Sequence, residues 1–273
     1  MYNQYSLNNA PELHPILVAL LGEAGFDSFQ ETDAGLLAFG TTARHGDWTA
    51  TLATLKKQFG FTYEWETLPE KNWNEEWESQ FPPLYVGDRL FIRADFHAPD
   101  PEVPTELIIT PKMAFGTGHH ATTYMMCELM FDLPLKEGRV LDYGCGTGVL
   151  AILAKKLFAD VVDAVDIEAP SVENTVENAA RNGVKLDAVI LGELKDVPAG
   201  PPYDFILANI NRNVILATAG ALYERLADAG TIVFSGILAR DEQLLVERLK
   251  RTGFQHQQTR QREDWRAFEF TKA

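Results

Sequence analysis

The strongest constraint on the fold is a short run, Arg139–Ala151, in which an apolar strand pattern passes through three alternating glycines into a helical pattern. The strand pattern ends at Asp142, and the glycines are Gly144, Gly146 and Gly148. Glycine adopts positive φ readily and lets a ligand approach the backbone with no Cβ in the way. The start of the following helix presents unpaired N–H groups and a positive dipole end. The run therefore predicts a ligand site at the carboxyl edge of a sheet, with a tight turn that binds nothing as the alternative.

From about Val140 onward the chain alternates strand-like and helix-like segments. The strand-like runs are Val140–Tyr143, Val161–Asp166, Ala188–Leu191, Phe205–Asn209 and Thr231–Ser235. The helix-like stretches are Val149–Phe158, Ser171–Asn182, Val214–Ala227 and Glu242–Thr252. This alternation predicts an α/β fold of the doubly wound type, with a mostly parallel sheet covered on both faces. Two further runs, Gly253–Gln257 and Trp265–Thr271, are expected to form a hairpin at one edge of the sheet.

The 273 residues suit one large domain and one small one. Residues 1–60 combine helical patterns at Pro11–Glu23 and Trp48–Phe59 with a strand-like run at Gly35–Gly40, which predicts a small α+β domain. Residues 61–104 are rich in Trp, Glu and Pro, which indicates a linker. We therefore expect a small domain at 1–60, a linker at 61–104 and the α/β domain at 105–273.

Two polar residues end neighbouring strand-like runs. Asp166 lies 22 residues beyond Gly144, and an acid at that place can accept both hydroxyls of an adenosine ribose, in S-adenosylmethionine or in a dinucleotide. The spacing G-x-G-x-G differs from the G-x-G-x-x-G of dinucleotide sites, which disfavours a nicotinamide-dependent dehydrogenase. Asn209 is expected at the same sheet edge, where a buried amide can hold an amine and orient its lone pair. The alternatives are an Asp166 that caps the helix near Pro170–Ser171 and an Asn209 that satisfies a turn.

The segment Thr110–Thr123 precedes a helical pattern that runs to Phe131. It contains two glycines, and Thr122 and Thr123 stand where a helix N-cap is expected. We interpret the segment as a lid over the cofactor, closing at Phe115–His119, with Thr123 hydrogen-bonded to the cofactor. An ordinary loop before a capped helix is the alternative.

Composition favours a cytoplasmic protein without a metal. No apolar stretch approaches the ~20 residues of a membrane span, and the N-terminus lacks the features of a secretory signal. With only Cys127 and Cys145, a disulfide framework or a Cys-rich zinc site is excluded. The adjacent His119 and His120 invite a metal hypothesis, but neighbouring residues rarely converge on one ion and no Cys or carboxylate cluster accompanies them.

The formal charge of −15 is distributed unevenly, since residues 61–110 hold eleven acidic and three basic residues. Such a surface repels a phosphate backbone and attracts basic partners. The charge therefore serves either solubility or a cationic substrate such as a Lys-rich protein. Charge alone does not separate the two.

Five stretches together resemble the PrmA family of methyltransferases, which act on the eleventh protein of the large ribosomal subunit. They are AFGTGHHATT, LDYGCGTGVLAILAKKL, AVDIEAPSVENTVENAARNGV, DFILANI and SGIL, and they run from about Lys112 to Ala239. FGTGHHATT is the most specific of them, and Trp73–Trp77 followed by Phe81 is similar to the family's linker. The chain departs from the family after Asn209, where it has Ile-Asn-Arg in place of small apolar residues.

The resemblance implies a class I methyltransferase with a seven-stranded sheet and S-adenosyl-L-methionine as cofactor. It also implies that residues 1–60 form a ferredoxin-like domain that recognises the substrate and is joined to the catalytic domain by a mobile linker. We expect Asn209 to be the catalytic residue. The expected cofactor-binding residues are Phe115, Gly116, Thr123, Gly144, Gly146, Asp166 and Asn209.

The function implied is methyl transfer to amino groups, both lysine side chains and the N-terminus, of a basic ribosomal protein. Methylation of another amine, in an RNA base or a small molecule, is the alternative, and a non-catalytic adaptor is a third hypothesis. We expect a monomer with no direct nucleic-acid partner and no membrane contact.

Overall fold

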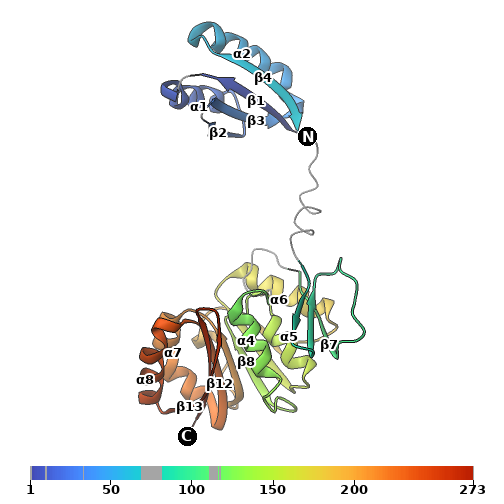
Figure 1. The fold of residues 1–273 in the computed structure, drawn as a ribbon, viewed down its shortest axis with the longest axis vertical. Helices are drawn as coiled ribbons and strands as arrows, with labels where there is room; N and C mark the ends of the chain where they lie inside the picture. The colour runs from blue at the N-terminus through green and yellow to red at the C-terminus, as the bar shows by residue number, and fades with distance from the viewer. Residues whose placement is uncertain are drawn as a thin grey trace. The chain divides into compact units, whose positions relative to one another are not determined.

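The computed structural model describes residues 2–9, 11–32, 34–68, 82–110, 116 and 118–272. The chain divides into two compact units, Met1–Gln80 and Phe81–Ala273 (Figure 1). Within the described ranges, no helix is both long enough and apolar enough to cross a membrane.

The first unit is a four-stranded antiparallel sheet with two helices. Its elements are β1 (Tyr2–Asn8), α1 (His14–Glu23), β2 (Ser28–Thr32), β3 (Gly35–Thr41), α2 (His45–Phe59) and β4 (Thr62–Leu68). The strand order is β2-β3-β1-β4, and the chain order is β-α-β-β-α-β, which is the ferredoxin-like arrangement. Alternate residues of β1 and β3 face both helices, so that Tyr5, Leu36, Leu17 and Trp48 share one buried core.

The expected boundaries of the first domain and of the linker are wrong. β4 pairs along its length with β1, so the domain continues past residue 60 to Leu68. β4 is an edge strand whose side chains from Glu64 to Thr67 are exposed. Its Glu and Trp residues belong to the Trp-, Glu- and Pro-rich composition that indicated a linker. At the other end, residues 84–108 form a three-stranded sheet of the second unit. Trp73, Trp77 and Phe81, which were compared with the family's linker, lie outside the described residues.

The second unit is built on a seven-stranded sheet of order β10-β9-β8-β11-β12-β14-β13. Its strands are β8 (Arg139–Tyr143), β9 (Val161–Asp166), β10 (Ala188–Leu191), β11 (Tyr203–Asn209), β12 (Leu226–Leu238), β13 (Phe254–Arg262) and β14 (Trp265–Lys272). The pairs from β10 to β12 are parallel, and β14 runs antiparallel to both of its neighbours. The doubly wound α/β class and the C-terminal hairpin are therefore confirmed.

Helices cover both faces of this sheet. They are α4 (Ala121–Met130), α5 (Val149–Lys156), α6 (Ala169–Arg181), α7 (Arg212–Arg225) and α8 (Glu242–Thr252). Apolar residues of α4, α5 and α6 join one core, which also includes the small sheet of β5 (Leu84–Val86), β6 (Leu90–Arg93) and β7 (Thr105–Ile108). Residues of α7 and α8 join a second core on the opposite face. This two-sided packing leaves the carboxyl ends of the parallel strands open to a ligand.

Candidate active site

A cleft of about 460 Å³ lies at the carboxyl edge of the parallel strands. The glycine loop after β8 contributes Gly144 and Gly146, the end of β9 contributes Asp166, and the end of β11 contributes Asn209. The structure therefore brings together four of the residues that the sequence selected. Phe115, also expected to bind the cofactor, lies outside the described residues.

The glycine loop is held close to its neighbours. Gly144 has φ +82°, and its N–H donates to the carbonyl of Val165 at 2.8 Å. A Cβ at this position would lie 2.4 Å from Cγ2 of Ile210, which also lines the cleft. Both the left-handed backbone and the close approach require glycine here.

Asp166 has two roles at the edge of the cleft. Its Oδ2 accepts a hydrogen bond from the N–H of Gly146 at 2.9 Å, and its Oδ1 accepts one from the N–H of Glu168 at 3.0 Å. The N-cap position of α6 is held by Glu168 and not by Asp166, and the Glu168 side chain makes no capping hydrogen bond. Each carboxylate oxygen carries a second lone pair, so Asp166 can shape the loop and still accept hydroxyl donors from a ligand in the cleft.

Behind the loop, Asp142 is completely buried. Its Oδ2 accepts from the N–H of Ala151 at 3.0 Å, while its Oδ1 is buried without a partner among the described residues. Burial, with a smaller contribution from the negative charge of Asp166, raises the pKa of Asp142 from 3.8 to about 7. Asp142 therefore supports the loop from inside the protein and does not line the cleft.

Asn209 is oriented by a neighbour from α4. Its Nδ2 donates to Oγ1 of Thr123 at 3.1 Å. Thr123 is fully buried, so its hydroxyl lies behind Asn209 and is not among the groups that line the cleft. Oδ1 of Asn209 is buried and has no hydrogen-bond partner among the described residues. An acceptor without a partner beside a ligand cleft is the expected sign of a donor supplied by a ligand.

The first turn of α4 is capped differently from the expectation. His120, and not Thr122 or Thr123, is the N-cap: its Nδ1 accepts from the N–H of Thr122, and its ring packs edge-on against Trp265. The ring of His119 contacts a different part of the chain: its Nε2 lies 2.8 Å from the carbonyl oxygen of Pro82. Thr122 and Thr123 occupy N2 and N3, and threonine is a commoner N-cap residue than histidine, so the sequence favoured the threonines.

Metal-binding chemistry is not apparent in the described part of the chain. No three His, Cys, Asp or Glu side chains there gather as a ligand set. Both cysteines are buried free thiols, and burial raises the pKa of Cys127 to about 12.

Sequence reasoning missed the residues just after Asn209. Ile210 and Asn211 line the cleft, and Asn211 is the N-cap of α7, its side chain accepting from the N–H of Val214 at 3.1 Å. Arg212 forms an ion pair with Asp241. An Asn placed directly before a helical pattern is a recognised N-cap signal, and that signal was available in the sequence.

The sheet order, the glycine loop, the acid at the end of β9 and the amide at the end of β11 define a class I S-adenosylmethionine-dependent methyltransferase. The cofactor fits the site, because the close glycine backbone, the Asp166 carboxylate and the unpartnered Oδ1 of Asn209 all lie around the cleft. The sequence model of the family described as ribosomal protein L11 methyltransferase (PrmA) matches residues 28–273. The chain belongs to this family.

Relatives of known name agree with this assignment. The ribosomal protein L11 methyltransferase of Porphyromonas gingivalis is 41% identical over 264 residues, which cover 94% of this chain and 90% of the relative. The enzyme of the same name from Bacteroides thetaiotaomicron is 33% identical, with 99% of each chain covered. The crystal structure of a ribosomal protein L11 methylase from Lactobacillus delbrueckii subsp. bulgaricus matches with a TM-score of 0.64 and 28% identity, covering 70% of this chain and 99% of that one.

Proposed function

We propose that this methyltransferase modifies amino groups of ribosomal protein L11, on lysine side chains and at the N-terminus. The observation that carries the proposal is the amide of Asn209, which is held by Thr123 and keeps an unpartnered acceptor beside the cleft. The names of the relatives supply the acceptor protein, and the net charge of −15 suits a basic substrate.

Asn209 is proposed to orient the amine that receives the methyl group. When bound, S-adenosylmethionine supplies an electrophilic methyl group on a sulfonium. An in-line displacement requires alignment more than covalent help, so a fixed amide that accepts an N–H from the amine can direct the nitrogen lone pair. The hydrogen bond from Nδ2 to Oγ1 of Thr123 holds the amide in place at the edge of the cleft. Thr123 is thereby assigned an orienting role rather than direct contact with the cofactor.

No dedicated general base is proposed. The amine attacks in its neutral form, although the pKa of a lysine in water is about 10.4. Desolvation in a cleft and a nearby positive charge both lower the pKa of an amine, which makes the neutral form accessible. Gly144, Gly146, Gly116 and Phe115 remain proposed cofactor contacts, with Asp166 as the acceptor of the ribose hydroxyls.

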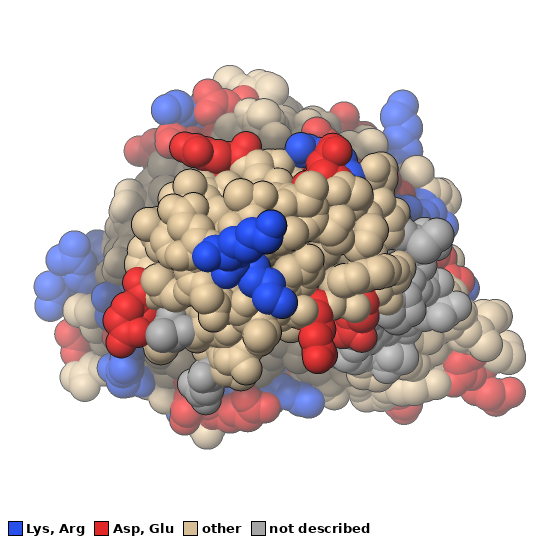
Figure 2. Space-filling view, turned by 90° about the horizontal axis from the view of Figure 1, so that it is seen from above, with Lys and Arg blue, Asp and Glu red and all other residues tan. Residues whose placement is uncertain are grey.

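We propose further that the enzyme acts as a cytoplasmic monomer on the protein and makes no direct contact with nucleic acid. Phosphate binding requires gathered positive charge. On the face drawn in Figure 2, one small group of Lys and Arg lies at the centre of an otherwise uncharged area, with Asp and Glu around it. The net charge of −15 argues against an RNA base as the acceptor, and the ferredoxin-like unit is proposed to recognise the protein substrate.

The test is intact mass spectrometry of recombinant L11 after incubation with the enzyme and S-adenosylmethionine. We expect mass increments in steps of one methyl group. Asp166→Ala should abolish them by weakening cofactor binding. Asn209→Ala should lower kcat by about 100-fold and leave the dissociation constant of the cofactor, measured by calorimetry, within about 5-fold.

Asp228→Ala serves as the control, because Asp228 is 96% exposed and lies outside the cleft, where its removal should leave turnover unchanged. If the enzyme binds the cofactor but adds no mass to L11, L11 is not the acceptor, and the assignment as a methyltransferase still holds. Full turnover by Asn209→Ala with unchanged cofactor affinity would reject the role of Asn209.

A further inference from the structure

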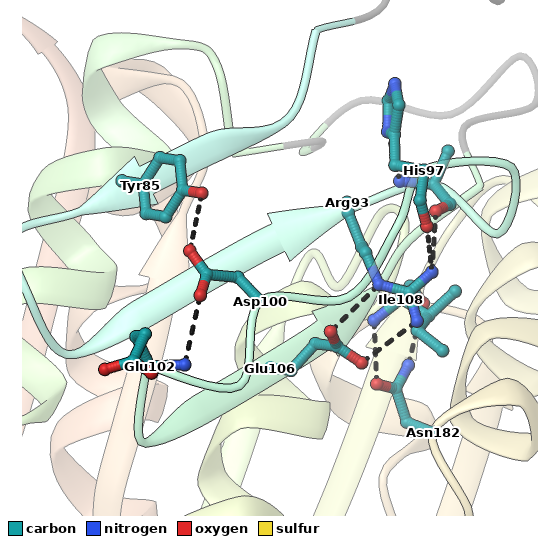
Figure 3. A network of polar contacts seen from close by, with 9 residues as sticks. Tyr85, Arg93, His97, Asp100, Glu102, Glu106, Ile108 and Asn182 are labelled. Atoms are coloured by element: carbon teal, nitrogen blue, oxygen red, sulfur yellow. Dashed lines mark hydrogen bonds and ion pairs between the residues drawn. The ribbon is translucent and has the colours of Figure 1, made fainter.

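Three buried asparagines, two on α6 and one just after it, bind the main chain of β7 and of the residues that follow it. Asn182, just after α6, accepts from the N–H of Ile108 at 2.9 Å and donates to its carbonyl at 2.7 Å (Figure 3). Asn178 accepts from the N–H of Thr110 at 3.1 Å, and Asn174 donates to the carbonyl of Thr110 at 3.0 Å. The other edge of β7 pairs with β6. The asparagine side chains thus take the place of a neighbouring strand for residues 108 and 110.

The same helix also holds the glycine loop. Nδ2 of Asn178 donates to the carbonyl of Thr147 at 2.9 Å, and the hydroxyl of Thr175 donates to the carbonyl of Gly146 at 3.0 Å. Asn178 therefore connects the cofactor loop with Thr110. Asn178, Thr147 and Thr175 are all completely buried, so water cannot replace these bonds.

The Thr147 side chain extends this network to the segment before α4. Its Oγ1 donates to the carbonyl of Gly116 at 2.6 Å. Seven residues further on, Thr123 accepts the hydrogen bond that orients Asn209. Between them, Gly118 (φ +96°) is in tight contact with Ile92, because a Cβ there would lie 2.7 Å from Cδ1 of Ile92. Gly116 is therefore bonded to the cofactor loop, and Thr123 is bonded to the amide beside the cleft.

We propose that Thr147 is a positioning residue for methyl transfer. Its hydroxyl sets the position of Gly116 relative to the glycine loop, and Gly116 is joined along the chain to Gly118 and the first turn of α4, where Thr123 holds Asn209. The inference rests on the proposed role of Asn209. Loss of the hydroxyl should lower the rate of transfer more than the affinity for the cofactor, because the loop itself keeps its hydrogen bonds to Asn178 and Thr175.

The variants Thr147→Val and Thr147→Ala both remove the hydroxyl, the first at nearly constant volume and the second without added bulk. Thr147→Ser keeps it and is the rescue variant. We expect kcat on L11 to fall about 10-fold in the first two and to return to within about 2-fold of the wild type in the third. The dissociation constant of S-adenosylmethionine should rise by no more than about 3-fold, because Gly144, Gly146 and Asp166 keep their places, and the thermal midpoint should fall by no more than about 4 °C for the one hydrogen bond lost. An unchanged kcat, or a fall that parallels a loss of cofactor affinity and thermal stability, overturns the proposal.

Hydrogen–deuterium exchange gives a readout that does not depend on the acceptor protein. Removing the hydroxyl should speed exchange of the amides from Gly118 to Thr123 by about 10-fold, with no change in α7. Unchanged exchange rejects the positioning role even if L11 is methylated. Faster exchange in an enzyme that does not modify L11 would support the positioning role of Thr147 and reject L11 as the acceptor protein.

Discussion

Burial determines how single polar residues of this site behave. Asp142 is the last residue but one of β8 and Asp166 is the last residue of the neighbouring parallel strand β9, yet only Asp166 lines the cleft. Asp142 is sealed under the glycine loop, and its pKa rises to about 7 because the charged form loses its water. Asn209 also depends on its surroundings, since the buried hydroxyl of Thr123 holds its amide at the edge of the cleft.

We expect Asp142 to make the enzyme less stable as the pH rises from about 4 to about 7. The unfolded chain releases this proton near pH 4, whereas the folded chain keeps it until about pH 7. In that window the folded state binds more protons, so the free energy of unfolding falls with rising pH, by up to about 4 kcal/mol. Below about pH 4 both states are protonated and the effect vanishes.

Asp142→Asn keeps the acceptor for the N–H of Ala151 and cannot ionise. Its advantage over the wild type should therefore grow between about pH 4 and pH 7, as measured by urea unfolding at a series of pH values. Parallel stability curves for the two proteins would show that Asp142 ionises normally in the folded state.

At the scale of elements, polar side chains form hydrogen bonds with backbone groups that have no partner in the strand pairing. Arg93 at the end of β6 is 8% exposed; it pairs with Glu106 through two hydrogen bonds of 2.9 and 3.1 Å and donates to the carbonyls of Ala94 and His97. The guanidinium thereby ties β6, β7 and the loop between them together (Figure 3). The planar guanidinium presents its N–H donors in directions that match this set of acceptors, whereas the ammonium group of a lysine cannot reach all of them.

Arg93→Lys should lower the free energy of unfolding by about 2 kcal/mol, because the lysine cannot satisfy both oxygens of Glu106 and the two carbonyls. Arg89→Lys is the matched control. Arg89 is 43% exposed and pairs with Asp132, so its exchange should cost less than about 1 kcal/mol. Equal costs in denaturant unfolding would mean that burial adds nothing to the Arg93 pair.

At the scale of the whole molecule, the two units have separate cores. The ferredoxin-like unit is packed around Trp48 and Tyr5, and the residues of this cluster do not occur in the two clusters of the second unit. Each unit therefore has the apolar core that a domain needs to fold by itself. This separation fits the proposed division between recognition of the protein and transfer of the methyl group.

A chain limited to residues 82–273 should fold and bind S-adenosylmethionine with a dissociation constant within about 3-fold of the full chain. It should methylate L11 with a kcat/KM lower by about 100-fold, because the tethered unit no longer raises the local concentration of the substrate. Calorimetry and mass spectrometry check the two values. Undiminished kcat/KM would remove the recognition role from the first unit.

The parts of the fold that the sequence predicted are those carried by local patterns. The strand–helix alternation after Val140 placed β8 to β12, and the glycines with Asp166 placed the cleft, because strand ends in a parallel sheet meet at one edge. The domain boundary at residue 60 was wrong although a strand signal follows it: Phe61, Tyr63 and Trp65 alternate with Thr62, Glu64 and Glu66. This alternation lies in a region rich in Trp, Glu and Pro, and that composition indicated a linker.

The residue types and their spacing thus determined the class of fold, the ligand cleft and the family of this protein. Only the tertiary structure decided what each polar side chain does. It placed Thr123 behind Asn209, made His120 the cap of α4, sealed Asp142 away from water and joined Thr147 to Gly116. These outcomes depend on atoms that lie far apart in the chain and on the water that packing removes from them, and a local pattern encodes neither.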